Sequence, residues 1–484
     1  MTVSWRLRPK PDPDLDAVVT GVYAGQLPDA VPAGFAAGTG FTGAVGDIAQ
    51  LPGAPGEPVC VLLGLGPPEA ADGAAIRRAA AGLARAASRY RRLAIEAPAV
   101  DLRPLVEGYL LGGYRFAGHR SAPGAQIDQH VDVVAPDRMQ TRKALFEGTR
   151  IGEAVTLARD LVNEPGGELT PRGFAERATS VAAATGLACE VWDTDRIAAE
   201  RLGGLLGVGR GSAEPPRLVR LGYRPAHYRP TRYRPTQHSG RIALVGKGVT
   251  FDAGGMSLKS TAQLVDMKAD MAGAAAVLAA MSVLDSLNCP VAADGWLPLT
   301  ENMISADPVR VGDVLTMRDG RTVEVRNADA EGRLILADAL VLAGETRPDA
   351  IIDIATLTDA AAVALGRKIA AVMSTDEALA DRLRDAAERA GEPIWPLPLP
   401  GAYRHQLESG VADLVNYTTG ARHGTALLAG LFLREFVPAG IPWAHLDIQG
   451  TALCDSDDGE WVAGATGFGV RTLAELLICS ERQD

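Results

Sequence analysis

Residues 242–259 read IALVGKGVTFDAGGMSLK, and the apolar run at their start, Ile242–Val245, predicts a buried β-strand that ends beside a lysine. A strand with so few polar positions is typical of a parallel sheet that helices cover on both faces. A second apolar run, Ile351–Ile354, predicts another strand of this kind, and helical patterns occur over residues 273–284 and 376–390. This alternation of strands and helices indicates an α/β fold.

The chain is long enough for two domains, with 484 residues of which 47% are hydrophobic and 22% charged. Residues 1–150 carry a predicted strand at Val59–Leu63, a helical pattern around residues 72–90, and no motif with an assignable chemistry. The apolar positions that begin at Ile151 follow the spacing of an amphipathic helix. We therefore expect a smaller N-terminal α/β domain over residues 1–150 and a larger C-terminal α/β/α domain with a central mixed sheet over residues 151–484.

The composition narrows the classes of partner. Lys and Arg number 48 and Asp and Glu 59, which gives a net charge of −11 and argues against broad binding to nucleic acid or anionic membranes. The opening residues lack the apolar core of a signal peptide, and no uncharged apolar stretch of about 18 residues occurs. Five scattered cysteines without CxxC pairs predict reduced thiols. We expect a cytoplasmic protein.

Seven charged residues between positions 247 and 333 lie in segments that are otherwise rich in Gly, Ala and apolar residues. Four carboxylates with two lysines and one arginine suit a buried site that holds two divalent cations and stabilises an oxyanion, because one carboxylate can bridge two ions. Any one of these residues alone would more often be a surface charge, but their combination favours hydrolysis. The seven residues are Lys247, Asp252, Lys259, Asp270, Asp329, Glu331 and Arg333.

The local sequence predicts the geometry of two of these segments. Asp329 and Glu331 are two residues apart, so at an extended strand end they would face the same side, and Gly332 would let the backbone approach an ion. Lys247 lies between two glycines directly after the first strand, where two nearby cations could remove its proton. The GxxxxGK[ST] spacing of a phosphate-binding loop is absent, so we expect no nucleotide site there.

Together these motifs resemble the leucine (cytosol) aminopeptidase family of di-zinc exopeptidases. The resemblance covers about residues 155–475 and rests on VGKGVTFDAGG, MKADMAGAA, NADAEGRLILADAL, IIDIATLT, WAHLDI and GATGFGVRTL. It implies that the C-terminal domain is catalytic and that the enzyme, a homohexamer, uses zinc or manganese to release N-terminal residues from peptides or aminoacyl amides.

The resemblance also implies a role for each charged residue. Lys259 would polarise the scissile carbonyl without binding metal, and Arg333 would hold a bicarbonate that acts as a general base. One metal ion would be bound by Asp252, Asp329 and Glu331. The other would be bound by Lys247, Asp252, Asp270 and Glu331.

Five positions match those that line the family's pocket for the substrate's first side chain: Met267, Thr356, Asp359, Gln449 and Ala452. The family has Gly and Ala where this chain has Asp359 and Gln449. A leucine side chain would leave these polar groups unpaired, so we expect polar, basic or small first residues to be preferred over leucine. In the alternative interpretation, Asp359 points into solvent or an ion pair and only backbone groups there meet the substrate.

Tyr-Arg-Pro occurs three times at intervals of five residues, beginning at Tyr223, Tyr228 and Tyr233. Regularly spaced prolines predict an extended surface loop. The simple interpretation is a tolerated insertion, and the alternative is a basic arm that contacts another subunit or an anionic partner. This arm leaves open a second class of function, a non-catalytic or moonlighting hexamer that binds DNA or acts as a scaffold.

Overall fold

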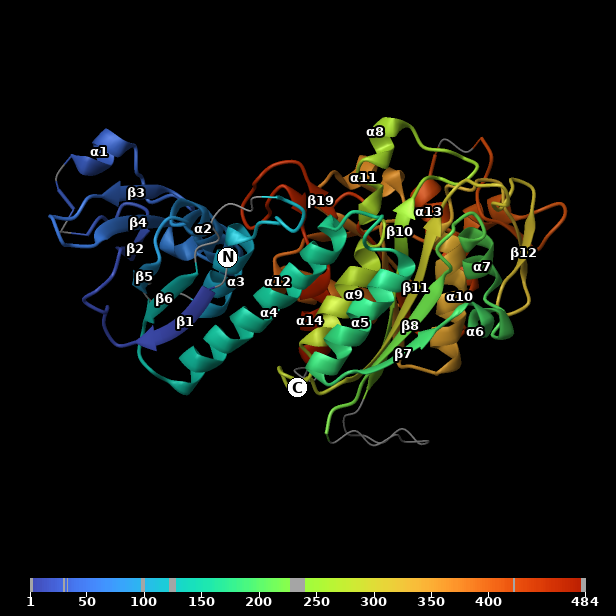
Figure 1. The fold of residues 1–484 in the computed structure, drawn as a ribbon, viewed down its shortest axis with the longest axis horizontal. Helices are drawn as coiled ribbons and strands as arrows, with labels where there is room; N and C mark the ends of the chain where they lie inside the picture. The colour runs from blue at the N-terminus through green and yellow to red at the C-terminus, as the bar shows by residue number, and fades with distance from the viewer. Residues whose placement is uncertain are drawn as a thin grey trace. The chain divides into compact units, whose positions relative to one another are not determined.

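The structure is a computed structural model, and it describes residues 3–28, 31–32, 34–96, 101–121, 128–226, 240–420 and 423–479. The chain divides into two compact units, both of which combine helices with a sheet (Figure 1). The boundary that we expect between residues 150 and 151 stays a prediction. The first unit comprises Met1–Thr156 and Cys454–Gly464, and the second comprises Leu157–Leu453 and Ala465–Asp484.

The first unit contains a six-stranded mixed sheet in the order β1-β6-β5-β2-β4-β3. Only the β3–β4 pair is antiparallel among its described pairings. Helix α2 (Gly73–Ala86) begins where the Asp72 side chain accepts a hydrogen bond from the backbone of Ala75, and it packs against α3 (Leu102–Gly113). The strands are β1 (Val3–Arg8), β2 (Ala17–Tyr23), β3 (Ile48–Leu51), β4 (Val59–Gly66), β5 (Arg92–Glu96) and β6 (Gln129–Val134).

The second unit contains a nine-stranded mixed sheet in the order β16-β15-β18-β14-β9-β11-β8-β7, with β10 paired to β11. The two predicted strands are β9 and β14, and they are parallel neighbours in the sheet. The strands are β7 (Ala188–Trp192), β8 (Arg217–Tyr223), β9 (Arg241–Gly246), β10 (Gly248–Asp252), β11 (Ala292–Asn302), β14 (Ala350–Ala355), β15 (Ala370–Ser374), β16 (Ile394–Pro396) and β18 (Trp443–Asp447).

Helices cover both faces of this sheet, which confirms the predicted α/β/α layers. Helix α9 (Ala272–Ser282) and helix α10 (Gly332–Glu345) pack on the same three strands, β9, β11 and β14 (Figure 1). The side chains of a strand alternate between faces. Accordingly, Val245 joins the core with α10, while an added Cβ at Gly295 would lie 2.6 Å from the sulfur of Met281 in α9.

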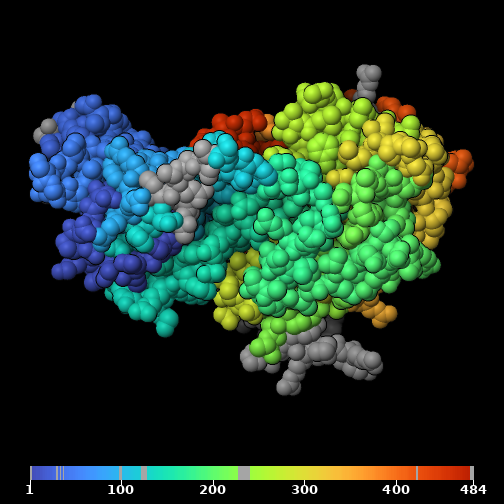
Figure 2. Space-filling model, in the orientation of Figure 1, coloured from blue at the N-terminus to red at the C-terminus, as the bar shows by residue number. Residues whose placement is uncertain are grey.

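The remaining described helices and strands include α1 and most of α4 in the first unit, and the others belong wholly or partly to the second unit. Figure 2 shows green residues around α5 and α7 and yellow residues around β12 on the viewed face of the second unit. These elements are α1 (Phe35–Thr39), α4 (Met139–Asn163), α5 (Pro171–Thr185), α6 (Thr194–Ala199), α7 (Gly203–Gly209), α8 (Thr261–Leu264), β12 (Val314–Thr316), β13 (Thr322–Glu324), α11 (Asp359–Leu365), α12 (Glu377–Ala390), β17 (Leu414–Val415), α13 (Thr425–Glu435), β19 (Leu453–Cys454), β20 (Gly464–Ala465) and α14 (Val470–Ile478).

Helix α4 begins at Met139, twelve residues before the predicted start at Ile151. The first part of the helix is mostly polar and only partly buried, so no clear apolar periodicity marks it. An ion pair at i,i+4 spacing, Lys143 with Glu147 at 3.6 Å, supports this exposed part. Within the described residues, no helix combines the length and apolar character that a membrane span requires.

The Tyr-Arg-Pro segment begins inside the sheet, which corrects the prediction of a surface loop for its first repeat. Tyr223 ends β8, is buried, and donates a hydrogen bond from its hydroxyl to the carbonyl of Cys289 at 2.9 Å. Its pairing opposite Ala293 of β11 outweighs the effect of the proline that follows. The repeats at Tyr228 and Tyr233 lie outside the described residues.

Candidate metal centre

The second unit holds a cavity of about 470 Å³ at the carboxyl edge of its parallel strands. Strand β9 ends beside Lys247, β10 ends at Asp252, and β14 ends beside Thr356, so the fold delivers these side chains to one edge. All twelve residues singled out in the sequence, five candidate metal ligands, two candidate catalytic residues and five pocket residues, line this cavity.

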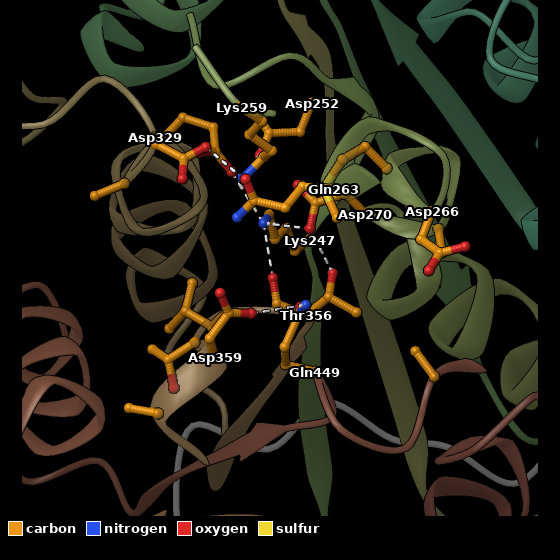
Figure 3. A pocket seen from close by; sticks show the side chains of 18 of the residues that line it. Lys247, Asp252, Lys259, Gln263, Asp266, Asp270, Asp329, Thr356, Asp359 and Gln449 are labelled. Atoms are coloured by element: carbon orange, nitrogen blue, oxygen red, sulfur yellow. Dashed lines mark hydrogen bonds and ion pairs between the residues drawn. The ribbon is translucent and has the colours of Figure 1, made fainter. Parts of the chain in front are cut away.

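Lys247 is buried at the centre of the cavity wall and makes three polar contacts (Figure 3). Its Nζ donates to Asp270 Oδ1 at 2.7 Å and to the carbonyl of Thr356 at 2.7 Å, and it pairs with Glu331 Oε1 at 2.9 Å. An added Cβ at Gly332 would lie 2.5 Å from Lys247 Cε. Gly332 therefore makes room for the lysine, and its closeness to an ion stays a prediction.

Asp252 has donors on both of its carboxylate oxygens. The backbone N–H of Gly254 donates to Oδ1 at 2.8 Å, and Lys259 Nζ lies 2.8 Å from Oδ2. Lys259 also pairs with Asp329. The lysine thus lies between two carboxylates that come from different segments of the chain.

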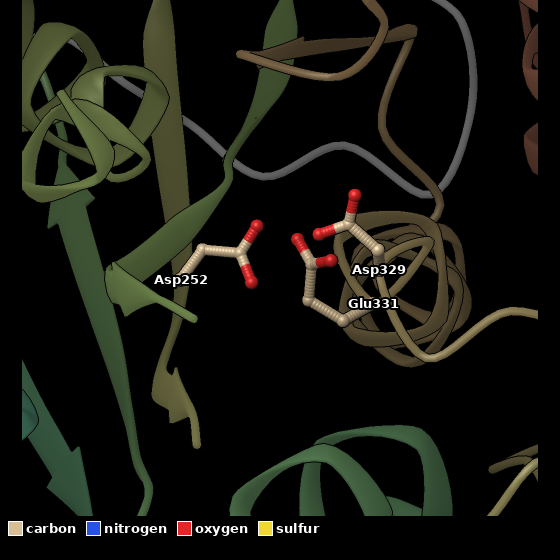
Figure 4. Close-up of side chains that lie close together, drawn as sticks. All are labelled: Asp252, Asp329 and Glu331. Atoms are coloured by element: carbon tan, nitrogen blue, oxygen red, sulfur yellow. The ribbon is translucent and has the colours of Figure 1, made fainter. Parts of the chain in front are cut away.

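Asp329 and Glu331 lie in a turn before α10, which corrects the expected strand end. The turn is held by the Asn327 side chain, whose Oδ1 accepts the N–H of Asp329 at 2.9 Å, and Glu331 is the N-cap residue of α10. The turn still brings the two side chains together. One carboxylate oxygen each from Asp252, Asp329 and Glu331 lie within 4.8 Å of one another (Figure 4).

This cluster carries more negative than positive charge at its centre. Burial, followed by the charge of Glu331, raises the pKa of Asp252 to about 7. Although burial alone would lower the pKa of Lys247, the charges of Asp270, Glu331 and Asp252 raise it above its usual value. Four carboxylates face two ammonium groups, which leaves two formal negative charges in a buried site.

The donor set fits divalent cations. Asp270 Oδ2 is buried and has no hydrogen-bond partner among the described residues. Its other oxygen accepts hydrogen bonds from Lys247 and, at 2.8 Å, from the hydroxyl of Thr356. An unpartnered carboxylate oxygen in an acidic, buried cluster is the ligand that a hard or borderline cation requires.

Arg333 lies in the first turn of α10 with its guanidinium buried. Its Nη1 donates to the carbonyl of Asn416 at 2.8 Å, and its Nε has no hydrogen-bond partner among the described residues. Burial lowers the pKa of this guanidinium to about 10, so it remains a cation at neutral pH. Arg333 thus lines the cavity as a buried cation whose Nε has no hydrogen-bond partner among the described residues.

The predicted side-chain pocket forms the opposite part of the cavity. Asp359 begins α11 and is exposed, and Gln449 Nε2 donates to its Oδ1 at 3.4 Å (Figure 3). The two polar groups therefore pair with each other, whereas we expected them to lack partners. Thr356 serves the metal side as well, and Met267 and Ala452 supply apolar surface.

Comparison with known proteins identifies the family. Residues 156–474 match the model of the catalytic domain of the cytosol aminopeptidase family, and residues 33–123 match the model of its N-terminal domain. The chain belongs to the cytosol aminopeptidase family. The resemblance seen in the motifs is thereby confirmed.

Individual members of the family are similar over most of their length. A probable cytosol aminopeptidase of Leifsonia xyli subsp. xyli is 45% identical over 454 residues, which cover 91% of this chain and 89% of the relative. The solved structure of the bottromycin maturation enzyme BotP in complex with Mn is 43% identical, with a TM-score of 0.88 and coverage of 96% and 99% of the two chains. A mutant of tomato leucine aminopeptidase is 29% identical, with a TM-score of 0.86 and coverage of 99% and 96%.

Membership in the cytosol aminopeptidase family establishes the reaction class. The chain is a metal-dependent aminopeptidase, a hydrolase that acts on the peptide bonds of peptide substrates. The two-domain architecture with a mixed central sheet is that of the family.

Two buried asparagines that support the centre were not found from the sequence. Asn302 ends β11 and donates to Asp252, while Asn416 follows β17 and holds the turn around Asn327. Each reaches a partner at least 50 residues away in the chain, so no local motif marks it.

Proposed function

We propose that this aminopeptidase uses two divalent cations, zinc or manganese, held by the five clustered residues. As the resemblance to the family implies, Asp252 and Glu331 would contact both ions. The first set would be Asp252, Asp329 and Glu331, and the second would be Lys247, Asp252, Asp270 and Glu331.

The observation that carries this proposal is the convergence of three carboxylates within 4.8 Å, beside a fourth whose Oδ2 lacks a partner. Ionised carboxylates in excess of the lysines are unfavourable in a buried site unless protons or cations neutralise them, and bound cations would do so at neutral pH. The manganese named with BotP, at 43% identity, supports the choice of metal. When bound, the cations supply Lewis acidity that lowers the pKa of a water toward neutrality, and a bicarbonate at Arg333 supplies a general base.

Two residues of the chain would act on the substrate without binding metal. Lys259 reaches the cavity between Asp252 and Asp329. Once these carboxylates are occupied, its ammonium can donate to the scissile carbonyl oxygen as negative charge develops. Arg333, with its free Nε, would bind and orient the bicarbonate.

The other part of the cavity would select the substrate's first residue. Asp359 presents a carboxylate and Gln449 an amide, and a first side chain with donors could replace their weak 3.4 Å contact with its own. We therefore propose that polar, basic or small first residues outrank leucine. The name bottromycin maturation enzyme, carried by a neighbour, supports specialisation toward particular peptides in this family.

We further propose a cytoplasmic homohexamer, which sedimentation analysis would test. The non-catalytic alternative, a hexamer that binds DNA or acts as a scaffold, has no support from the described residues, since most of the Tyr-Arg-Pro segment lies outside them. A gel shift that persists at physiological salt would revive it, because phosphate contacts weaken steeply with salt.

Chelation followed by reconstitution tests the two-metal proposal. We expect the chelated enzyme to be inactive on aminoacyl amides and to recover in proportion to Zn²⁺ or Mn²⁺ uptake, up to about two ions per chain as measured by mass spectrometry. An N-acetylated peptide serves as the control and should stay intact. Full activity after exhaustive chelation, or saturation with one ion, would contradict the proposal.

A further inference from the structure

Three of the four proposed metal-binding carboxylates come from two chain segments that share little regular structure. Asp252 ends a strand, whereas Asp329 and Glu331 lie in a turn. Lys259 pairs with a carboxylate of each segment, but the carboxylates still repel one another before cations arrive. Some group must hold the strand and the turn in register.

Asn302 lies between these two segments. It ends β11 directly opposite Asp252 in the parallel β10–β11 ladder, and its carbonyl accepts the N–H of Ala253 at 2.9 Å. Its side chain is buried, with 1% exposed. An added Cβ at Gly255, which has a φ of +56°, would lie 2.7 Å from Asn302 Oδ1, so a glycine leaves the space that the amide occupies.

The amide nitrogen of Asn302 faces acceptors on both segments. Nδ2 donates to Asp252 Oδ1 at 2.8 Å and to the carbonyl of Ala328 at 3.0 Å, and it lies 3.5 Å from Glu331 Oε2. All three neighbours are acceptors, so the nitrogen rather than the oxygen must point at them. One NH₂ group thus links the strand carboxylate to the turn.

The contact also orients Asp252. Its Oδ1 already accepts from Asn302 Nδ2 and from the Gly254 N–H, while Oδ2 faces Lys259. We propose that Asn302 is a positioning residue that pre-forms the metal centre, by joining the strand of Asp252 to the turn of Asp329 and Glu331. This inference rests on the proposed metal set.

The test is a Mn²⁺ titration of the full chain by calorimetry, with Asn302→Leu and the smaller Asn302→Ser. Both remove the amide, and the serine variant covers the case in which leucine prevents folding. We expect the affinity for Mn²⁺ to fall about 10–100-fold, as for other residues that orient metal ligands. Because Asn302 would not touch substrate, saturating Mn²⁺ should restore kcat to within about tenfold.

Thr300→Val is the matched control. Thr300 lies on the same strand, is equally buried, and donates to the carbonyl of Glu301 rather than to a carboxylate of the cluster. It should leave the affinity for Mn²⁺ unchanged. Folded Asn302 variants that bind Mn²⁺ like the unaltered enzyme, or an equal loss in Thr300→Val, would overturn the proposal. Failure of the metal proposal itself would show separately, as an unaltered enzyme that takes up no Mn²⁺.

Discussion

The two sides of the cavity differ in how firmly their side chains are held. On the metal side, Lys247 makes contacts of 2.7–2.9 Å with Asp270 and Glu331, and all three residues are buried. In the predicted pocket for the substrate's first side chain, Asp359 is exposed and its contact with Gln449 is 3.4 Å long. One half is a buried network of ion pairs with an excess of carboxylates, and the other is a single weak hydrogen bond at the surface.

This difference separates chemistry from specificity. A buried charge that loses its partner costs several kcal/mol, about 3–5 for a buried pair, so substitutions on the metal side affect the whole cluster. An exposed pair rearranges at little cost because water replaces the missing partner. The structure can therefore change its preferred first residue without altering its metal ligands.

The largest loss of metal and activity is expected when either of the two carboxylates proposed to bridge the ions is removed. Asp252→Ala and Glu331→Ala should lose both ions and more activity than the roughly 10²–10³-fold that follows removal of one oxyanion donor. Asp270→Ala should lose one ion and less activity. Metal content by mass spectrometry together with kcat/KM on an aminoacyl amide measures both.

The conservative Asp252→Asn variant controls for folding, since it keeps the shape of the side chain while removing its charge. It should fold as judged by circular dichroism and still fail to retain both ions. An Asp252→Ala enzyme that holds two ions per chain would show that Asp252 does not bridge.

A smaller effect is expected at the two residues that would act on the substrate. Lys259→Ala and Arg333→Ala should keep both metals and lose about 10²–10³-fold in kcat. Lys268→Met is a matched control, because this nearby lysine donates to the carbonyl of Asn163 at 2.7 Å and not to the clustered carboxylates. Loss of metal from the Lys259 variant would contradict the role assigned to it.

The residues on the metal side of the cavity could be predicted from the sequence because short motifs contain them. Apolar strands place Lys247 and Asp252 at the sheet edge, and the spacing of the charged residues identifies the family without any knowledge of the fold. The grouping of Asp329 with Glu331 was right for a different reason, since a turn held by Asn327 brings them together and not a strand.

The remaining features depend on contacts between distant segments, which no single motif contains. Asn302 meets Asp252 across 50 residues, and Asn416 reaches Arg326 across 90. The role of Gly332 follows from the path of the Lys247 side chain, and the pairing of Asp359 with Gln449 from the meeting of the start of α11 with the turn after β18. Such neighbours become visible only in three dimensions.

The smallest effect is a change in the ranking of substrates by their first residue. It tests whether the pocket for that residue is independent of the metal side. The resemblance to the family implies Gly and Ala at the positions of Asp359 and Gln449, so Asp359→Gly combined with Gln449→Ala should give an apolar pocket. We expect leucine to gain on arginine, glutamine and alanine by about tenfold or less in kcat/KM, because the existing pair is exposed and already satisfied in part. Measurement on the four aminoacyl amides with both enzymes gives the ranking.

The metal content of this double variant supplies the control, since neither residue contacts a carboxylate of the cluster and both ions should remain. If the ranking stays unchanged, Asp359 serves only to begin α11 and the substrate meets backbone groups there. If leucine is already the best substrate of the unaltered enzyme, the two polar side chains do not face it. If metal is lost, the two sides of the cavity are coupled through Thr356, whose carbonyl and hydroxyl contact Lys247 and Asp270, and chemistry and specificity are not separable in this enzyme.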